Sequence, residues 1–268
     1  MIFLGILFFV LGAVIGSFLN VVVLRYNTGM TVVGGRSECF SCSKTLRWYE
    51  LVPVVSFCML RGKCSSCKSG ISWQYPLVEL FTASLFLFYF LNYSFEFSIP
   101  YILNSIFHLL ILSILIAISV YDLRHKIIPD GLVYAFITLS FIGLFLDLPT
   151  TAFHAPSISE LIAGPILFAF FFILWFVSKG TWMGFGDVKL VLGFGWFLGL
   201  AEGISAVVLA FWIGAAVSLV IMAFEKFTHK GTLSLKSQIP FAPFLILGLF
   251  IEFFAHFDIF GLKLLLGM

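Results

Sequence analysis

The sequence predicts an all-α polytopic membrane protein with about eight transmembrane helices. Hydrophobic residues make up 61% of the 268 residues, charged residues make up only 10%, and the mean hydropathy is +1.13. Soluble domains carry about 25% charged residues, so a soluble fold of this length has no means of burying so much apolar surface. Lipid can cover that surface, and helices satisfy their own backbone hydrogen bonds within it.

Apolar runs separated by polar segments predict where these helices lie. They are Ile2–Val23, Leu77–Leu91, Tyr101–Tyr121, Gly131–Leu146, Leu161–Val177, Asp187–Leu200, Ile204–Phe224 and Phe241–Phe257. The first run lacks the basic start and the small-residue cleavage site of a secretory signal, so we expect it to be retained. Several runs are shorter than the ~20 residues of a straight crossing. The sixth is the weakest, because it contains Gly193, Gly195 and Gly199.

Basic residues gather in alternate loops, and this pattern predicts the sidedness of the chain. The first, third, fifth and seventh loops hold Arg25, Arg36, Lys44, Arg47, Arg61, Lys63, Lys68, Arg124, Lys126, Lys179, Lys189, Lys226, Lys230 and Lys236, which leaves only Lys263 of the 15 basic residues. By the positive-inside rule these loops are cytoplasmic and both termini are periplasmic. If the sixth segment were re-entrant, the last three of these lysines would move outside, so eight spans are favoured.

This topology predicts three parts of the chain. Residues 1–23 form the first transmembrane helix, and residues 24–76 form a cytoplasmic loop that holds all five cysteines. Residues 77–268 form a bundle of seven membrane helices. We therefore expect most of the chemistry to lie either in the loop or where acidic residues enter the bundle.

Two acidic residues stand at the cytoplasmic ends of predicted helices. Asp122 ends the third helix and Asp187 opens the sixth. A carboxylate in this position is costly unless it is solvated, paired or functional. The alternative is helix capping, which suits Asp130 well and is open to Asp187, but a negative charge at the C-terminal end of a helix opposes the dipole at Asp122.

Two carboxyl groups that lie close together can share one proton, because both cannot ionise cheaply. One can then act as a base toward water while the other polarises a scissile carbonyl group. Gly184 and Gly186 precede Asp187, and we expect them to permit positive φ or a close approach of backbone or substrate. We do not pair Lys189 with Asp187, and expect its side chain to extend to the membrane interface instead.

The cysteines form two CxxC pairs, Cys39 with Cys42 and Cys64 with Cys67. Four thiolates in this pattern can close a tetrahedron around Zn²⁺. The alternatives are two disulfides, which rarely persist in the cytoplasm, and redox chemistry, which lacks a thioredoxin-like context. We favour a structural zinc site. The fifth cysteine, Cys58, is most simply a small buried hydrophobe.

Five patterns together resemble the type IV prepilin leader peptidases, a family of GxGD-type membrane aspartyl proteases. These patterns are Gly16–Asn20, the paired CxxC motifs, Asp122–Asp130 with its Ile-Pro-Asp ending, Gly184–Asp187, and Ile239–Phe244, which carries Ala242 where the family usually has glycine. The resemblance implies that Asp122 and Asp187 are the catalytic pair.

The resemblance also implies substrates and cofactors. The expected partners are prepilins or pseudopilins of type IV pili or type II secretion, whose basic leader is cut after a glycine on the cytoplasmic side of the bacterial inner membrane. Many members also N-methylate the new amino terminus with S-adenosylmethionine. Besides these substrates we expect the lipid bilayer, and no nucleic acid, as a partner.

Other polar residues receive structural interpretations, and other functions stay open. We expect Asn20 to bond between helices and Glu79 to cap its helix rather than hold the basic leader. Paired membrane aspartates also serve proton-coupled transporters, although those sites lie near the midplane. A signal-peptide-peptidase-like protease and a non-enzymatic scaffold are the remaining alternatives.

Overall fold

The computed structural model describes residues 1–93, 97–147, 152–228 and 240–261, but not the side chains of residues 147, 152 and 225–228. Lys230, Lys236 and Lys263 of the charge pattern, and Ile239 of the last motif, lie outside the described residues. The described chain is helical, apart from irregular loops and a hairpin of two-residue strands, β1 (Leu146–Asp147) and β2 (Ala152–Phe153). The all-α prediction is therefore confirmed.

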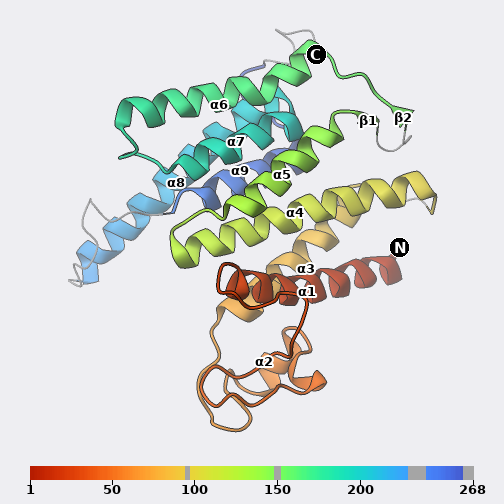
Figure 1. Ribbon diagram of the computed structural model, residues 1–268, viewed down its shortest axis with the longest axis vertical. Coiled ribbons are helices and arrows are strands. Elements are labelled where there is room, and N and C mark those ends of the chain that lie inside the picture. The colour runs from red at the N-terminus through yellow and green to blue at the C-terminus, as the bar shows by residue number, and fades with distance from the viewer. Residues whose placement is uncertain (94–96, 148–151, 229–239, 262–268) are drawn as a thin grey trace. The chain divides into compact units, whose positions relative to one another are not determined.

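Eight long helices occupy the predicted positions, and one short helix lies in the cysteine loop. They are α1 (Ile2–Arg25), α2 (Val55–Met59, the short one), α3 (Gln74–Asn92), α4 (Ile99–His125), α5 (Asp130–Gly143), α6 (Ile158–Ser178), α7 (Phe185–Leu198), α8 (Leu200–Thr228) and α9 (Ala242–Ala255). Figure 1 labels them along the chain.

Five of the helices, α1, α3, α4, α6 and α8, are long and apolar enough to cross a membrane. The other three long helices have 14 residues each. At ~1.5 Å per residue such a helix is about 21 Å long, which is less than the ~30 Å hydrocarbon layer. Five of the eight expected spans are therefore clear candidates, and the other three correspond to runs that were already shorter than a straight crossing requires.

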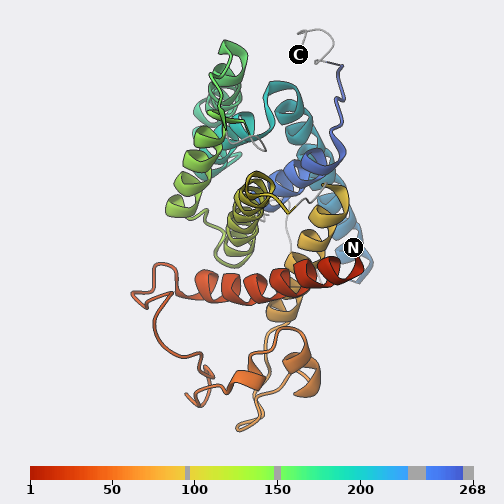
Figure 2. The ribbon, with the colours of Figure 1, turned by 90° about the vertical axis from the view of Figure 1, so that its right-hand side faces the viewer.

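The chain divides into two compact units, Met1–Phe97 and Ser98–Met268. In the first unit α1 packs along α3, and the loop between them extends away from both helices (Figure 2). The two backbones approach closely at Gly12 and Gly16, where an added Cβ would lie 2.7 Å from Ala83 Cα and 2.8 Å from Glu79 Cα. Small residues permit this close helix packing. In this structure α3 therefore belongs to the same compact unit as α1.

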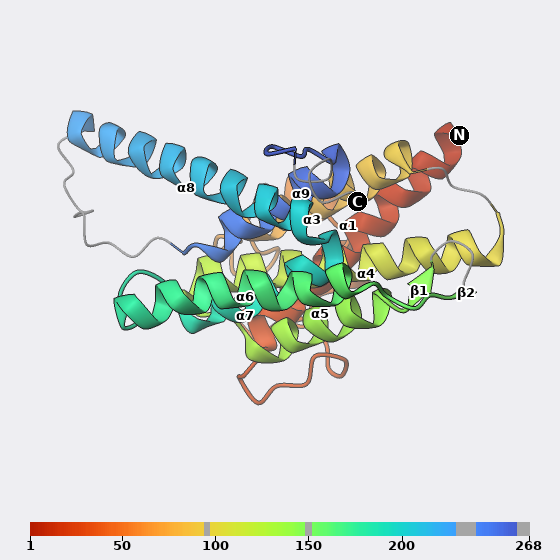
Figure 3. The ribbon, with the colours of Figure 1, turned by 90° about the horizontal axis from the view of Figure 1, so that it is seen from above.

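In the second unit α7 packs against four other helices. It contacts α5, α6, α8 and α9, and α6 runs beside it (Figures 1 and 3). Four of its side chains, Val188, Leu190, Val191 and Phe194, are fully buried. Gly195, one of the glycines that made it the weakest predicted span, serves this packing: an added Cβ there would lie 2.5 Å from the backbone of α6.

Candidate active site and metal centre

The two predicted acids of the second unit lie at facing helix ends. Asp122 is in the last turn of α4 and is 4% exposed, and Asp187 is in the first turn of α7 and is 5% exposed. Their carboxyl groups are close enough to interact electrostatically. The fold therefore brings together two acidic side chains that are 65 positions apart in the sequence.

The two carboxyl groups differ in their contacts. The Asp122 carboxylate accepts a hydrogen bond from the backbone N–H of Ala242, at the start of α9. The Asp187 carboxylate accepts hydrogen bonds from the backbone N–H of Gly184 and from the backbone N–H of Asp187 itself. Its side chain therefore caps the start of α7, as the capping alternative expected. Its Oδ1 is buried and has no hydrogen-bond partner among the described residues. Such an oxygen is rare in a folded protein and is expected where water or substrate binds.

The glycines of the Gly184–Asp187 motif have different roles. Gly184 has φ −75°, and neither glycine has a positive φ, so that expectation was wrong. Close approach is the reason at Gly186, where an added Cβ would lie 2.7 Å from Ile128 Cβ. At Gly184 the nearest atom would be Asp187 Oδ2, at an ordinary 3.7 Å. Only Gly186 is therefore required by packing.

The segment between α4 and α5 begins near Asp122 and contacts the residue next to Asp187. α4 ends with Lys126 in the left-handed conformation, at φ 55°, and its N–H bonds to the carbonyl oxygen of Asp122 at 2.7 Å. Pro129 then precedes the first residue of α5. A proline disfavours a helical conformation of the residue before it, so the helix was expected to end before Ile128. Ile128 contacts Gly186 from this segment, so the two motifs pack directly against each other.

Lys189 and Asp130 form an ion pair, which the sequence did not predict. We expected Lys189 to extend toward the membrane interface and Asp130 to cap α5. Asp130 is in the first turn of α5, where it complements the positive end of that helix as expected, whereas the Lys189 side chain is only 14% exposed. The two residues are 59 positions apart, and the packing of α7 on α5 brings them together.

The polar residues of α1 and α3 link these two helices to the loop. Asn20 donates to the carbonyl oxygen of Tyr75 at 3.2 Å and accepts from Gln74 at 3.3 Å, so its predicted interhelical role is confirmed. Glu79 does not cap α3. It is buried, and accepts from the backbone N–H of Val54 at 2.7 Å and from Ser17.

The four paired cysteines lie together in the loop. The Sγ atoms of Cys39, Cys42, Cys64 and Cys67 are all within 4.8 Å of one another. A tetrahedron with Zn–S bonds of ~2.3 Å has edges of about 3.8 Å, and the Cys39 Sγ–Cys67 Sγ distance is 3.8 Å. All five cysteines are free thiols, so the disulfide alternative finds no support. Cys58 is outside the cluster and exposed, not buried as we expected.

Hydrogen bonds favour the thiolate form at Cys39 and Cys67 and disfavour it at Cys42. Backbone N–H groups of Ser41 and Cys42, with the Ser69 hydroxyl, lower the pKa of Cys39 to about 6. The Ser69 hydroxyl and N–H lower the pKa of Cys67. At Cys42 the N–H of Lys44 also favours the thiolate, but hydrogen bonds to Cys67 and Cys39, together with burial, outweigh it and raise the pKa to about 11. Four thiolates without a cation repel one another, and a divalent metal removes that conflict.

Sequence reasoning missed Glu50, which joins the two CxxC pairs. Its carboxylate accepts from Lys44 Nζ at 2.8 Å, from the backbone N–H of Arg47 at 2.8 Å and from the hydroxyl of Ser65. Lys44 follows the first pair and Ser65 lies inside the second. The N–H of Arg47, with Lys44 and Ser65, lowers the pKa of Glu50 to about 2. An acid between two cysteine pairs was the only indication in the sequence.

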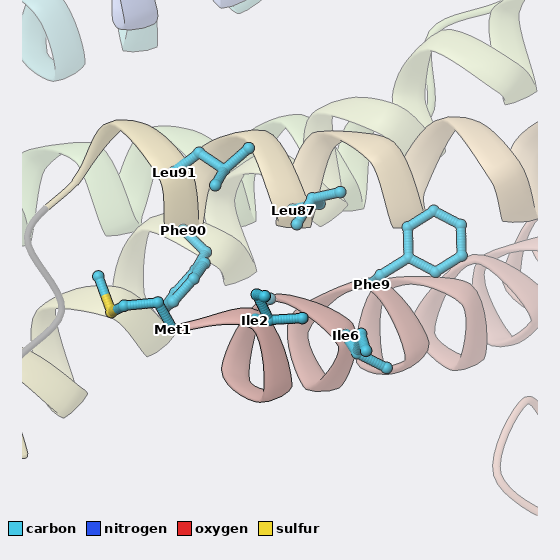
Figure 4. Close-up of a pocket in the computed structure, with 8 residues that line it drawn as sticks. Met1, Ile2, Ile6, Phe9, Leu87, Phe90 and Leu91 are labelled. Atoms are coloured by element: carbon cyan, nitrogen blue, oxygen red, sulfur yellow. The ribbon is translucent and has the colours of Figure 1, made fainter.

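The first unit also contains an apolar cavity of about 430 Å³ between α1 and α3. Figure 4 shows its lining, which includes Met1, Ile6, Phe9, Leu87 and Leu91. All of its lining side chains are apolar, and neither Asp122 nor Asp187 lines it. The cavity therefore presents no polar side chain to a ligand.

Comparison with known proteins decides the family. The family model of the bacterial peptidase A24 N-terminal domain matches residues 10–93, and that of the type IV leader peptidase family matches residues 109–219. A prepilin leader peptidase/N-methyltransferase of Pseudomonas aeruginosa is 31% identical over 263 residues, which cover 88% of this chain and 84% of that protein. The chain belongs to the type IV leader peptidase family. It is therefore an enzyme, a peptidase of this family, and its apolar helices give it the character of a membrane protein.

Two further relatives carry the same name. The one from Stutzerimonas stutzeri is 29% identical, over 88% of this chain and 85% of the relative. The one from Myxococcus xanthus is 31% identical, over 81% of this chain but only 63% of the relative. No solved structure matches the chain. The first family model spans all four cysteines of the cluster, and the second spans both Asp122 and Asp187.

Proposed function

We propose that the chain is an aspartic endopeptidase that removes the basic leader of type IV prepilins or pseudopilins, with Asp122 and Asp187 as the catalytic pair. The observation that carries this proposal is the pairing of two buried carboxyl groups, from the ends of α4 and α7, inside the segment matched by the peptidase family model. The names of the relatives support the substrate class.

The chemistry needs one water molecule and one shared proton. The ionised carboxylate takes a proton from water as the water oxygen attacks the scissile carbonyl carbon, and the protonated carboxyl group polarises the carbonyl oxygen. When the tetrahedral species collapses, the C–N bond breaks and a carboxyl group delivers a proton to the leaving amine. Asp187 Oδ1, which has no hydrogen-bond partner in the described part of the chain, is an acceptor available to the attacking water.

The proposed sidedness follows from charge. The loops that hold nearly all basic residues face the cytoplasm of a bacterial inner membrane, by the positive-inside rule. This orientation puts the cysteine loop and the acid pair on the cytoplasmic side and both termini in the periplasm. A short positive leader lies in the same compartment, and its cleavage after a glycine frees the hydrophobic helix that follows.

The cysteine cluster fits a structural zinc ion. Cys39, Cys42, Cys64 and Cys67 would supply four thiolates and leave no open position on the metal. The ion would hold the two CxxC pairs together, and the acid pair lies in the other unit of the chain. The peptidase chemistry needs no metal, so the proposed role of zinc is to stabilise the loop.

N-methylation of the new amino terminus with S-adenosylmethionine belongs to the same proposal. The names of the relatives carry this activity. It is assigned here to no particular residue. Neither a proton-coupled transporter nor a non-enzymatic scaffold is favoured by any observation, since the chain belongs to a peptidase family.

The full chain, reconstituted in liposomes with a synthetic prepilin, tests both activities. Mass spectrometry should show cleavage after the glycine, and an added methyl group only when S-adenosylmethionine is present. Asp122→Asn and Asp187→Asn should each abolish cleavage while the protein remains folded and inserted. Cleavage by either variant at the wild-type rate would overturn the proposed mechanism, and proton-coupled flux lost in both variants without any cleaved product would favour a transporter.

A further inference from the structure

The ammonium group of Lys189 is enclosed by three side chains from two helices. It forms an ion pair with Asp130 and lies 5.4 Å from the ring centre of Tyr134, on α5, and 5.6 Å from the ring centre of Phe185, on α7. Both rings are within the ~6 Å range of a cation–π contact. These four residues are called the Lys189 cage below.

The cage joins the two motifs that carry the acids. Phe185 is the residue between the glycines of the Gly184–Asp187 motif, and Lys189 follows Asp187 by two positions. On the other side, Asp130 ends the segment that begins at Asp122. Next to the cage, Gly186 packs against Ile128 of that same segment. The cage therefore lies where the start of α7 meets the start of α5.

This location matters because of how the Asp187 carboxyl group is held. Its carboxylate accepts hydrogen bonds from backbone N–H groups at the start of α7, and its Oδ1 has no hydrogen-bond partner among the described residues. The position of this carboxyl group therefore depends on where the first turn of α7 lies. A turn at the end of a 14-residue helix needs a tertiary anchor.

The anchor is suited to this task electrostatically. Asp130 is in the first turn of α5, where the helix dipole favours a negative charge. The Lys189 side chain is only 14% exposed, so the loss of its partner would leave a partly buried charge uncompensated. The Asp130 side chain is 61% exposed, which lets it be exchanged without opening the core.

We infer that the Lys189 cage fixes the first turn of α7 on α5 and so positions Asp187 for catalysis, with Lys189 and Asp130 as positioning residues. This inference rests on the proposed function. It predicts that the cage acts on turnover and not on substrate affinity, since neither residue needs to touch the leader.

The experiment compares variants of the full chain in proteoliposomes with a synthetic prepilin. Lys189→Met keeps the length of the side chain but removes its charge, and Lys189→Arg keeps the charge and can stack on both rings. A misplacement of 1 Å can cost ~100-fold in rate, so Lys189→Met should lower kcat by roughly 10- to 100-fold with little change in KM. Lys189→Arg should keep most of the activity. Lys179→Met, at the exposed end of α6, is the matched control and should behave as wild type.

A double-variant cycle separates the pair from two independent effects. If Lys189 and Asp130 act together, Lys189→Met with Asp130→Asn should lose no more activity than Lys189→Met alone. Independent roles would instead multiply the two losses, and that result would overturn the inference. Wild-type kcat in Lys189→Met, or a change confined to KM, would overturn it as well.

The same assay distinguishes this inference from the proposed function. Asp187→Asn serves as the reference for complete loss. If Asp187→Asn is inactive while Lys189→Met is fully active, only the role of the cage is wrong. If Asp187→Asn cleaves normally, the proposed mechanism fails, and with it the role of the cage. Asp130→Asn, which changes an exposed side chain, provides a test even if Lys189→Met does not fold.

Discussion

The replacement of Gly186 by alanine should damage the enzyme far more than the same replacement at Gly184. The added Cβ at position 186 would lie 2.7 Å from Ile128 Cβ, 3.0 Å from its Cδ1 and 3.2 Å from its Cγ1. Carbon atoms pack at about 3.5–4.0 Å, so Ile128 and the first turn of α7 must separate by about 1 Å. Overpacking of this kind costs ~1–3 kcal/mol of stability.

Asp187 is the next residue in the chain, so the same shift displaces the carboxyl group. Displacement by 1 Å can lower a rate by ~100-fold. At Gly184 the added Cβ would meet nothing closer than Asp187 Oδ2, at 3.7 Å, and the backbone φ of −75° suits alanine. We therefore expect Gly186→Ala to reduce kcat by at least ~10-fold more than Gly184→Ala.

The assay is prepilin cleavage under single-turnover conditions, with thermal unfolding measured in the same detergent. A lower melting temperature together with the lower kcat in Gly186→Ala alone is the expected result. Equal effects at the two glycines would refute the steric argument. A larger loss at Gly184 would show that the motif needs its first glycine for substrate and not its second for packing.

Three further predictions concern the first unit. Cys42→Ser should release the bound metal and destabilise the loop, whereas Cys58→Ser, at the exposed cysteine outside the cluster, should keep the same metal content as the wild type. The metal content of each purified variant is the measurement that tests this. The pKa of Glu50 is lowered from 4.5 to about 2 in the folded loop, so its contribution to stability is complete above pH 4.5 and is lost as the pH falls through about 2. Hydrogen exchange of the metal-free loop should show this loss in the wild type and not in Glu50→Gln, and identical pH profiles would contradict it. Gly12→Ala should lower the melting temperature more than Gly5→Ala, because its Cβ would meet the α3 backbone at 2.7 Å while that of Gly5 meets only the movable tip of Leu87 at 3.3 Å.

The sequence predicts the helices because apolar runs are long and the polar interruptions between them are clear. It also predicts that the two acids lie close together and that the four cysteines form a cluster. Acidic residues at the ends of membrane helices are rare, and the cysteines occur in two regular pairs. The lengths of α5 and α9 were overestimated, because the sequence shows where apolar residues occur and not where a helix cap begins. The helix α7 has the predicted length but begins two residues earlier than expected.

The contacts made by single side chains were harder to predict. Lys189 pairs with Asp130 only because α5 and α7 pack together, and no local pattern shows that two residues 59 positions apart will meet. Glu79 looked like a cap from its place near a helix start, yet it binds Val54 of the loop. In both cases tertiary packing, and not the helix on which the residue lies, selects the partner.

The central claim is that Asp122 and Asp187 act as one unit on one water molecule. It is tested most directly by single-turnover cleavage rates for Asp122→Asn, Asp187→Asn and the double variant, all confirmed as folded. Residues that act as a unit are strongly non-additive, so each single variant should fall to the same background rate as the double variant. Substantial cleavage in either single variant, with a further fall in the double variant, would contradict the claim.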